Sequence, residues 1–204
     1  LEISVGAFRN YTSLATVNLP EGLLYIRDYA FYFCTNLISV KIPDSVTEIG
    51  YNVFAACSSL QEFSGKFASE DGRCLIIDGE LNSFASAGLA EYAIPDNVTK
   101  IGEGAFHDCQ SLTSVIIGDS ITTIGVDAFW ACTTLTSVYC KATTPPSIAS
   151  CVFYYEDDET YEYLTINCRI YVPTESASAY RSKWEKEGED PYNIVGYDFE
   201  NGGN

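Results

Sequence analysis

Eight cysteines and a single histidine are the side chains of this 204-residue sequence that are best suited to nucleophilic catalysis or metal binding. The histidine, His107, lies between Phe106 and Asp108, and any Ser-His or Cys-His mechanism would have to use it. The sequence contains no Gly-x-Ser-x-Gly motif, no glycine-rich phosphate loop and no metal-spaced histidine cluster. We therefore expect His107 to be an exposed turn residue, and we expect no catalytic residue, no metal and no cofactor.

Acidic residues are the other candidates for chemistry, and they far outnumber the basic ones. Asp and Glu total 28 against 11 Lys and Arg, which gives a net charge of −17. Such a field repels a phosphate backbone, so nucleic acid is excluded as a partner. The densest acidic run, residues 156–159 with Glu162, lacks the alternating oxygen ligands and the glycine of an EF-hand loop. We expect a solvated loop there rather than a calcium site.

Hydrophobic content limits the architecture that positions these residues. A hydrophobic share of 47% with 19% charged residues indicates a folded, globular chain. The longest aliphatic stretches, such as residues 115–117, are far shorter than the ~18–20 residues of a membrane-spanning helix, so we expect no span. The sequence starts at Leu1 without a signal-peptide pattern or an initiator Met, which leaves open a segment upstream.

The chain is built from a repeat of 23 residues. A small residue followed by Phe recurs six times, and the phenylalanines are spaced by 23, 23, 52, 23 and 24 residues: Phe8, Phe31, Phe54, Phe106, Phe129 and Phe153. Four of them are followed by a cysteine three residues later and a leucine three residues after that: Cys34/Leu37, Cys57/Leu60, Cys109/Leu112 and Cys132/Leu135. A fixed period of this length predicts a solenoid of stacked turns.

Each repeat predicts a strand, a turn, a second strand and a helical turn. The alternating Leu-x-x-Val-x-Ile pattern of residues 37–42 is typical of a short strand, and the proline that follows predicts the turn. The 52-residue gap contains an enlarged repeat, in which Asp78-Gly79 has the signature of a tight hairpin. We expect an inserted β-hairpin within residues 65–88, in place of the usual second strand and helical turn.

The repeat places four of the cysteines, Cys34, Cys57, Cys109 and Cys132, in one column. Neighbouring strands of a stack are about 4.7–4.9 Å apart, whereas the Cβ atoms of a disulfide lie about 3.5–4.5 Å apart and zinc ligands converge on one point. We therefore expect these four residues to be free, buried thiols. Pairing of Cys140 with Cys151 stays open.

The repeats resemble the BspA-like, Treponema-type leucine-rich repeats of surface antigens from host-associated bacteria. The resemblance rests on residues 49–60, IGYNVFAACSSL, and 101–115, IGEGAFHDCQSLTSV, and it covers about residues 1–153. It implies an α/β repeat solenoid, a right-handed leucine-rich-repeat stack of short strands and helical turns. It also implies an extracellular or surface-anchored bacterial protein with a role in adhesion or interaction.

The repeat pattern ends near Cys168, and we expect residues 168–204 to cap the solenoid formed by residues 1–167. A cap is required because the last turn of a solenoid otherwise exposes its hydrophobic face. Residues 174–186 predict a helix with Tyr180 and Trp184 on one apolar face, where Trp184 acts as a core anchor. Residues 192–197 predict an edge strand.

Aromatic residues on the turns are the candidate binding site. A residue that follows a repeat Phe should point outward because the Phe points inward, which gives the candidates Tyr32, His107, Trp130 and Tyr154. Tyr51, which lies nearby in its turn, is a further candidate. Tyr32 and Trp130 are separated by four repeat steps, roughly 19 Å, if the enlarged repeat counts as one.

From these residues we expect a non-enzymatic surface binding or adhesion module that recognises a protein partner or a host glycan. The alternatives are a glycan-capture accessory protein of a nutrient-uptake system and, in third place, a hydrolase. Ordinary exposed aromatic content would also account for the aromatic turns.

Overall fold

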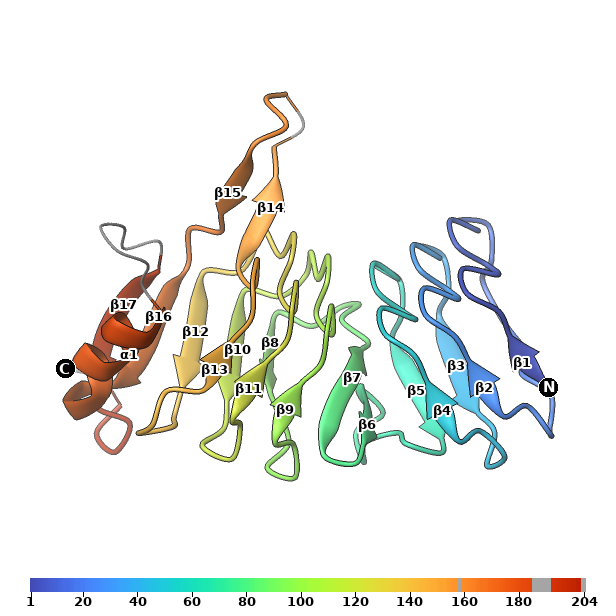
Figure 1. Ribbon diagram of the computed structural model, residues 1–204, viewed down its shortest axis with the longest axis horizontal. Helices are drawn as coiled ribbons and strands as arrows, with labels where there is room; N and C mark the ends of the chain where they lie inside the picture. The colour runs from blue at the N-terminus through green and yellow to red at the C-terminus, as the bar shows by residue number, and fades with distance from the viewer. Residues whose placement is uncertain (158, 185–191, 203–204) are drawn as a thin grey trace.

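The computed structural model of the protein describes residues 1–157, 159–184 and 192–202. It is a β-solenoid of about eight turns with the two termini at opposite ends (Figure 1). The elements are β1 (Glu2–Ile3), β2 (Tyr25–Ile26), β3 (Ser39–Ile42), β4 (Glu48–Ile49), β5 (Glu62–Gly65), β6 (Cys74–Ile77), β7 (Glu80–Phe84), β8 (Glu91–Ala93), β9 (Lys100–Ile101), β10 (Ser114–Ile117), β11 (Thr123–Ile124), β12 (Ser137–Cys140), β13 (Ser147–Ile148), β14 (Tyr154–Glu156), β15 (Tyr163–Thr165), β16 (Arg169–Pro173), a 3-10 helix (Thr174–Ser176), α1 (Ala177–Trp184) and β17 (Asn193–Tyr197).

Two ladders of parallel strands run along the solenoid, and both are interrupted at the enlarged repeat. The first strands of the repeats, continued by β16 and β17 of the carboxy-terminal segment, form the sheets β3-β5 and β17-β16-β12-β10-β8. The second strands form the sheets β1-β2-β4 and β13-β11-β9-β7, and β6 adds an antiparallel edge strand to the latter. Pairing is in register with the repeat, so that Val115 lies opposite Val138 on one side and Tyr92 on the other. The expected 23-residue period is confirmed.

The inserted hairpin is confirmed, although its place in the repeat differs from the expected one. β6 pairs antiparallel with β7, and Asp78 and Gly79 take left-handed backbones at the turn. The hairpin does not replace the second strand, because β7 itself pairs in parallel with β9 as the second strand of its repeat. The additional segment is therefore β6 together with the loop that precedes it.

The expected helical turns around each Ala-Phe pair are tight turns instead. In the second repeat, Tyr29 and Phe33 have left-handed backbones with φ of 57° and 60°. The N–H groups of Phe31 and Phe33 donate to the carbonyls of Val53 and Ala55 in the next turn, both at 3.0 Å. Because a helix uses these N–H groups internally, none forms here. The α/β expectation is corrected accordingly, since α1 is the one α-helix in the described residues.

The hydrophobic core divides into two clusters that meet at the enlarged repeat. The repeat phenylalanines form one stack, Phe8, Phe31 and Phe54, with ring centroids 5.1 and 5.3 Å apart, and a second stack, Phe106, Phe129 and Phe153, with centroids 4.7 and 5.1 Å apart. Phe84 joins the second stack, 4.6 Å from Phe106, whereas Phe63 packs edge-on against Phe54. Leu75 belongs to the first cluster and Cys74 to the second, so β6 contributes to both.

The cysteine column consists of free, buried thiols at Cys34, Cys57, Cys109 and Cys132, as expected. The Sγ atom of Cys57 donates to the carbonyl of Phe31 in the preceding repeat at 3.2 Å, and Cys34 and Cys132 make the same bond. Burial raises the pKa of the Cys57 thiol to about 12. Cys140 is likewise a free and buried thiol, so it does not pair with Cys151.

The carboxy-terminal segment closes the solenoid with β16, α1 and β17. β17 is the edge strand of its sheet, as expected. Trp184 is buried, and its Nε1 donates to the carbonyl of Pro146 at 2.9 Å, which agrees with a core anchor. Residues 185 and 186 of the predicted helix lie outside the described residues.

A second hairpin, β14–β15, projects beyond the turns (Figure 1) and was not expected from the sequence. The acidic run forms its tip, where the Asp157 carboxylate accepts hydrogen bonds from the backbone of Glu159 and Thr160. Asp158 lies outside the described residues.

Candidate functional site

Four of the five candidate residues, all except Tyr51, lie on one edge of the solenoid. We call this row the turn ridge, and it consists of the residues that follow the repeat phenylalanines: Arg9, Tyr32, Ala55, His107, Trp130 and Tyr154. The backbone holds them in line, because the tip of each turn is hydrogen-bonded to the tip of the next, as from the Asp108 N–H to the carbonyl of Trp130 at 2.7 Å. A ridge fixed by backbone bonds presents its side chains with little loss of conformational freedom on binding.

Tyr32 is the centre of the best-connected part of the turn ridge. The Arg9 guanidinium lies over its ring, 5.0 Å from the centroid, and the His107 ring packs edge-on against it at 5.6 Å. Tyr29 also packs edge-on against it at 5.8 Å. Burial raises the pKa of Tyr32; Arg9 opposes this rise and Asp108 adds to it. Tyr32 and His107, two residues that the sequence analysis singled out, are thus in direct contact.

His107 is half-buried, and the expectation of an exposed histidine is wrong. Its ring packs on Tyr32 and, within the described residues, its buried Nδ1 atom has no hydrogen-bond partner. Burial lowers the pKa of His107 to about 4, so the imidazole is neutral at pH 7. In this state the ring serves as a packing surface for Tyr32.

Tyr32 comes close to His107 because the enlarged repeat adds no turn to the ridge. The Ala56 N–H donates to the carbonyl of His107 at 3.3 Å, which places consecutive tips from different sides of the insertion against each other. The Asn52 side chain spans this junction, because its Nδ2 donates a hydrogen bond to the Glu103 carboxylate at 3.0 Å. Tyr32 and Trp130 are therefore separated by three steps rather than four, roughly 14 Å instead of 19 Å.

The remaining candidates are placed differently. Trp130 is half-buried on the turn after His107, and Tyr154 is half-buried at the start of β14, where its carbonyl accepts from the Ala131 N–H at 2.8 Å. Tyr51 is 54% exposed and lies at the base of its turn, outside the ridge. It lines a depression of about 460 Å³ at the break between the sheets, together with Arg27 and other charged residues.

A second aromatic surface, which the repeat pattern does not indicate, lies on the outer face of the β17-β16-β12-β10-β8 sheet. Tyr139 on β12 stacks on Tyr171 on β16 with centroids 4.7 Å apart, and Tyr197 packs edge-on against both at 5.4 Å. We call these three residues the strand-face cluster. The alternation of Val138-Tyr139-Cys140 places Tyr139 outward, but the alignment with Tyr171 depended on the register of a strand beyond the repeats.

A depression of about 780 Å³ adjoins the strand-face cluster at the cap. It combines aromatic side chains with carboxylates, and its lining includes Tyr197, Phe199, Glu175, Asp198 and Lys141. The mixture of rings and polar groups is one that sugar ligands can use.

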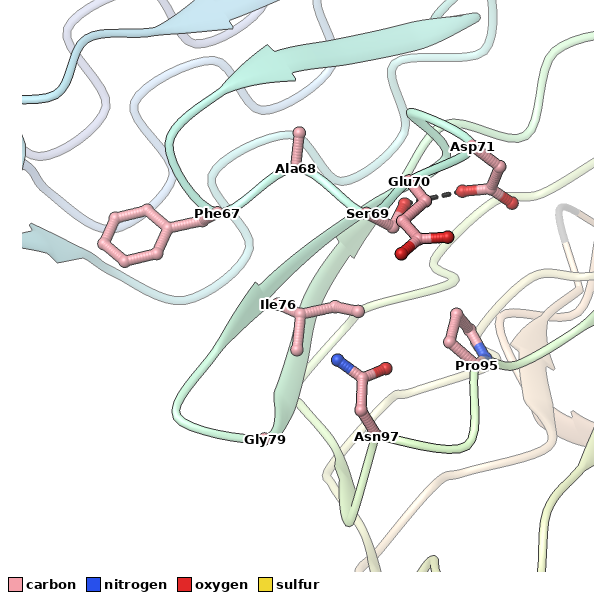
Figure 2. A pocket seen from close by; sticks show the side chains of 9 residues that line it. All are labelled: Phe67, Ala68, Ser69, Glu70, Asp71, Ile76, Gly79, Pro95 and Asn97. Atoms are coloured by element: carbon pink, nitrogen blue, oxygen red, sulfur yellow. Dashed lines mark hydrogen bonds between the residues drawn. The ribbon is translucent and has the colours of Figure 1, made fainter.

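A third hollow, of about 770 Å³, lies beside the inserted hairpin (Figure 2). Residues 67–71, Ile76 and Gly79 form it from the insertion, and Pro95 and Asn97 close it from the following turn. In this pocket the Asp71 carboxylate accepts hydrogen bonds from the Ser69 hydroxyl at 2.6 Å and from the Tyr92 hydroxyl at 3.0 Å.

In residues 1–157, 159–184 and 192–202, no group of three or more His, Cys, Asp or Glu side chains is placed to hold a metal ion. Over the same residues, no helix has the length and apolar character to cross a membrane.

Comparison with known proteins gives one family and several related folds. The model of the BspA-type leucine-rich repeat region matches six copies, over residues 1–69 and 80–170. The chain is similar to a leucine-rich cell surface protein of Faecalibacterium prausnitzii, with 26% identity and a TM-score of 0.60 over 97% of this chain and 57% of that one. No curated protein sequence matches the chain.

The pneumococcal vaccine antigen PcpA is a second similar structure. It has 14% identity and a TM-score of 0.53 over 97% of this chain and 65% of that one, which supports the fold alone. The chain thus spans less than two thirds of the length of either protein.

Proposed function

Since the chain belongs to the BspA-type leucine-rich repeat family, we propose that it is a non-catalytic binding module of the bacterial cell surface that recognises a protein partner through the turn ridge. The observation that carries this proposal is the packing of Arg9, Tyr32 and His107 into one continuous, half-exposed surface across the enlarged repeat. Tyrosine and arginine are over-represented among the residues that dominate protein interfaces. The similar Faecalibacterium prausnitzii protein is described as a cell surface protein, which supports the location.

Ring geometry favours a protein over a glycan at the turn ridge. A sugar stacks on an open ring face, but one face of Tyr32 is already covered by the Arg9 guanidinium at 5.0 Å. In the strand-face cluster, Tyr139 and Tyr171 cover each other, with an interplanar angle of 11°. Rings that present edges and hydroxyl groups suit the mixed apolar and hydrogen-bonding contacts of a protein surface.

A non-catalytic role agrees with the chemistry of the turn ridge. Its single imidazole is neutral and packed, and the thiols of the cysteine column are buried with raised pKa values at Cys57 and Cys132. Catalytic nucleophiles need the opposite, a lowered pKa and access to substrate.

One observation favours the glycan-capture alternative as a second candidate. The depression at the cap brings Tyr197 and Phe199 together with Glu175 and Asp198 in about 780 Å³, a size typical of small-ligand sites. A glycan partner would be expected there rather than on the turn ridge.

Binding measurements separate these candidates. We expect the protein to bind within a panel of immobilised extracellular-matrix proteins, and a glycan array tested in parallel examines the alternative. With the matrix protein that binds, surface plasmon resonance should show that Tyr32→Ala and Trp130→Ala each weaken binding by about 2 kcal/mol, close to additively because they lie roughly 14 Å apart.

Two further variants locate the surface. Tyr171→Ala tests the strand-face cluster, and Tyr51→Ala is an exposed aromatic control outside the turn ridge. Loss of binding in Tyr171→Ala alone would move the site to the strand face. Binding only on the glycan array would refute the protein-partner proposal.

A further inference from the structure

The pocket beside the inserted hairpin is the place where this chain departs from its own repeat. Four of its lining residues, Glu70, Asp71, Ile76 and Gly79, lie within residues 70–79, which the family model leaves unmatched. We propose that this pocket binds a lysine or arginine side chain of a protein partner. The proposal rests on the proposed protein-binding function and adds the chemistry of one contact.

The lining of the pocket suits a long aliphatic stem. Ala68, Ile76 and Pro95 contribute apolar surface to it, and the Ile76 side chain is only half-buried. Figure 2 shows the Glu70 carboxylate directed into the space between Ile76 and Pro95, above the Asn97 amide. Lysine and arginine bury their methylene groups along such surface while their charged ends reach polar groups.

The polar end of the pocket carries negative charge that the chain itself does not neutralise. Burial disfavours the ionised form of Asp71, but hydrogen bonds from Ser69, Arg73 and Tyr92 outweigh it and lower its pKa, so this carboxylate is charged at pH 7. Within the described parts of the chain, the neighbouring Glu70 carboxylate makes no hydrogen bond and no ion pair.

The two basic residues of this segment are engaged elsewhere. Arg73 donates to the carbonyls of Ala85 and Ala87, both at 3.1 Å, and the Lys66 ammonium donates to the carbonyl of Val46. Neither occupies the pocket, although each is close to it in the sequence. A cation from a partner therefore has no internal competitor at Glu70.

Charge complementarity selects the basic occupant over other side chains. The net charge of −17 steers a basic partner towards this protein and repels an acidic one. A neutral polar side chain could form a hydrogen bond with Asn97 but would leave the Glu70 carboxylate without a counter-charge. The volume of about 770 Å³ exceeds a single side chain, which leaves room for the flanking residues of a partner loop.

A titration followed by nuclear magnetic resonance tests the proposal. The ¹⁵N-labelled protein is titrated at low ionic strength with acetyl-Ala-Arg-Ala-amide, with the lysine peptide in parallel and the uncharged citrulline peptide as the control. We expect saturable shifts at the amides of Asp71, Ile76 and Asn97 with the basic peptides and much weaker shifts with citrulline.

Three variants make the test specific. Glu70→Gln should weaken binding of the arginine peptide at least about threefold, in line with the loss of a partly exposed ion pair. Glu21→Gln removes the same charge at an exposed turn far along the chain and should change nothing. Asn97→Asp adds a carboxylate to the pocket and should strengthen binding, an effect that a merely structural role of Asn97 does not predict.

The outcomes that overturn the proposal are distinct from those that overturn the proposed function. Equal effects of Glu70→Gln and Glu21→Gln, or equal binding of the citrulline peptide, would exclude the pocket as a cation site. Tyr32→Ala should leave peptide binding unchanged while it weakens binding of the matrix protein. The two proposals can therefore fail separately.

Discussion

Replacing Phe106 by alanine tests the packing on which the whole arrangement depends. Phe106 is fully buried, and its ring lies between Phe84 at 4.6 Å and Phe129 at 4.7 Å. Phe→Ala in a closed core costs about 3–5 kcal/mol in total, and each aromatic pair that is lost contributes about 0.5–1.5 kcal/mol within that range, so a ring with two such pairs falls in its upper half. With two pairs lost, we expect a loss in the free energy of unfolding of about 4–5 kcal/mol.

Phe8→Ala is the matched control, since it is the same change at the first ring of the first stack. Phe8 is half-buried and stacks on Phe31 at 5.1 Å on one side. We expect this variant to lose about 1–2 kcal/mol in the free energy of unfolding, because the Phe8 ring is only half-buried and has one stacked neighbour instead of two.

Urea denaturation followed by both circular dichroism and tryptophan fluorescence measures the two losses. Trp184 belongs to the second core cluster, so fluorescence reports mainly on that half, whereas circular dichroism reports on all strands. Phe106→Ala should shift the fluorescence transition more than Phe31→Ala does, because Phe31 lies in the first cluster. A change below about 1 kcal/mol for Phe106→Ala, or equal losses for Phe8 and Phe106, would refute the stacked column.

Three further predictions follow from the same packing. The thiols of Cys34, Cys57, Cys109 and Cys132 should react with Ellman's reagent only after denaturation, because they are buried; mass spectrometry that found two of them bridged would contradict the column. Gly104→Ala should lower the free energy of unfolding by more than about 2 kcal/mol, because Gly104 has φ +59° and a Cβ there would overlap the Asn52 side chain. Gly22→Ala, at φ +88° with open space around it, should lower it by about 1 kcal/mol, and thermal or urea unfolding measures both. The imidazole of His107 should titrate with a pKa of about 4 in nuclear magnetic resonance, below the ordinary value of 6.5. Between these two pH values the unfolded chain binds a proton that the native chain excludes. The contribution of His107 to stability is therefore complete above pH 6.5 and is lost as the pH falls towards 4. A measured pKa near 6.5 would show that His107 is solvated.

The repeat, the hairpin and the cysteine column could be predicted because each depends on local spacing. The 23-residue period alone aligns Cys57 with its neighbours, and Asp78-Gly79 marks the hairpin whatever surrounds it. The edge strand β17 and the anchoring role of Trp184 followed from the need to close the last turn. In these cases the short-range pattern and the global fold impose the same conformation.

The errors arose where distant segments decide the outcome. The turns looked helical because Phe31 and its neighbours have helical spacing, but their N–H groups are donated to the next repeat. His107 was expected to be exposed because it follows an inward-pointing Phe, whereas Tyr32 from a distant repeat packs against its ring. The strand-face cluster depended on pairing between β12 and β16, which lies outside the repeat register.

The inserted segment has opposite effects at the two edges of the solenoid. At the turn edge it adds nothing, so the tips that carry Ala56 and His107 meet and the turn ridge stays continuous. At the other edge it adds β6 and its loop, and the pocket opens between Glu70 and Asn97. Because the two surfaces lie on opposite edges, their contributions to binding should be independent, and a partner that uses both must extend across the width of the solenoid.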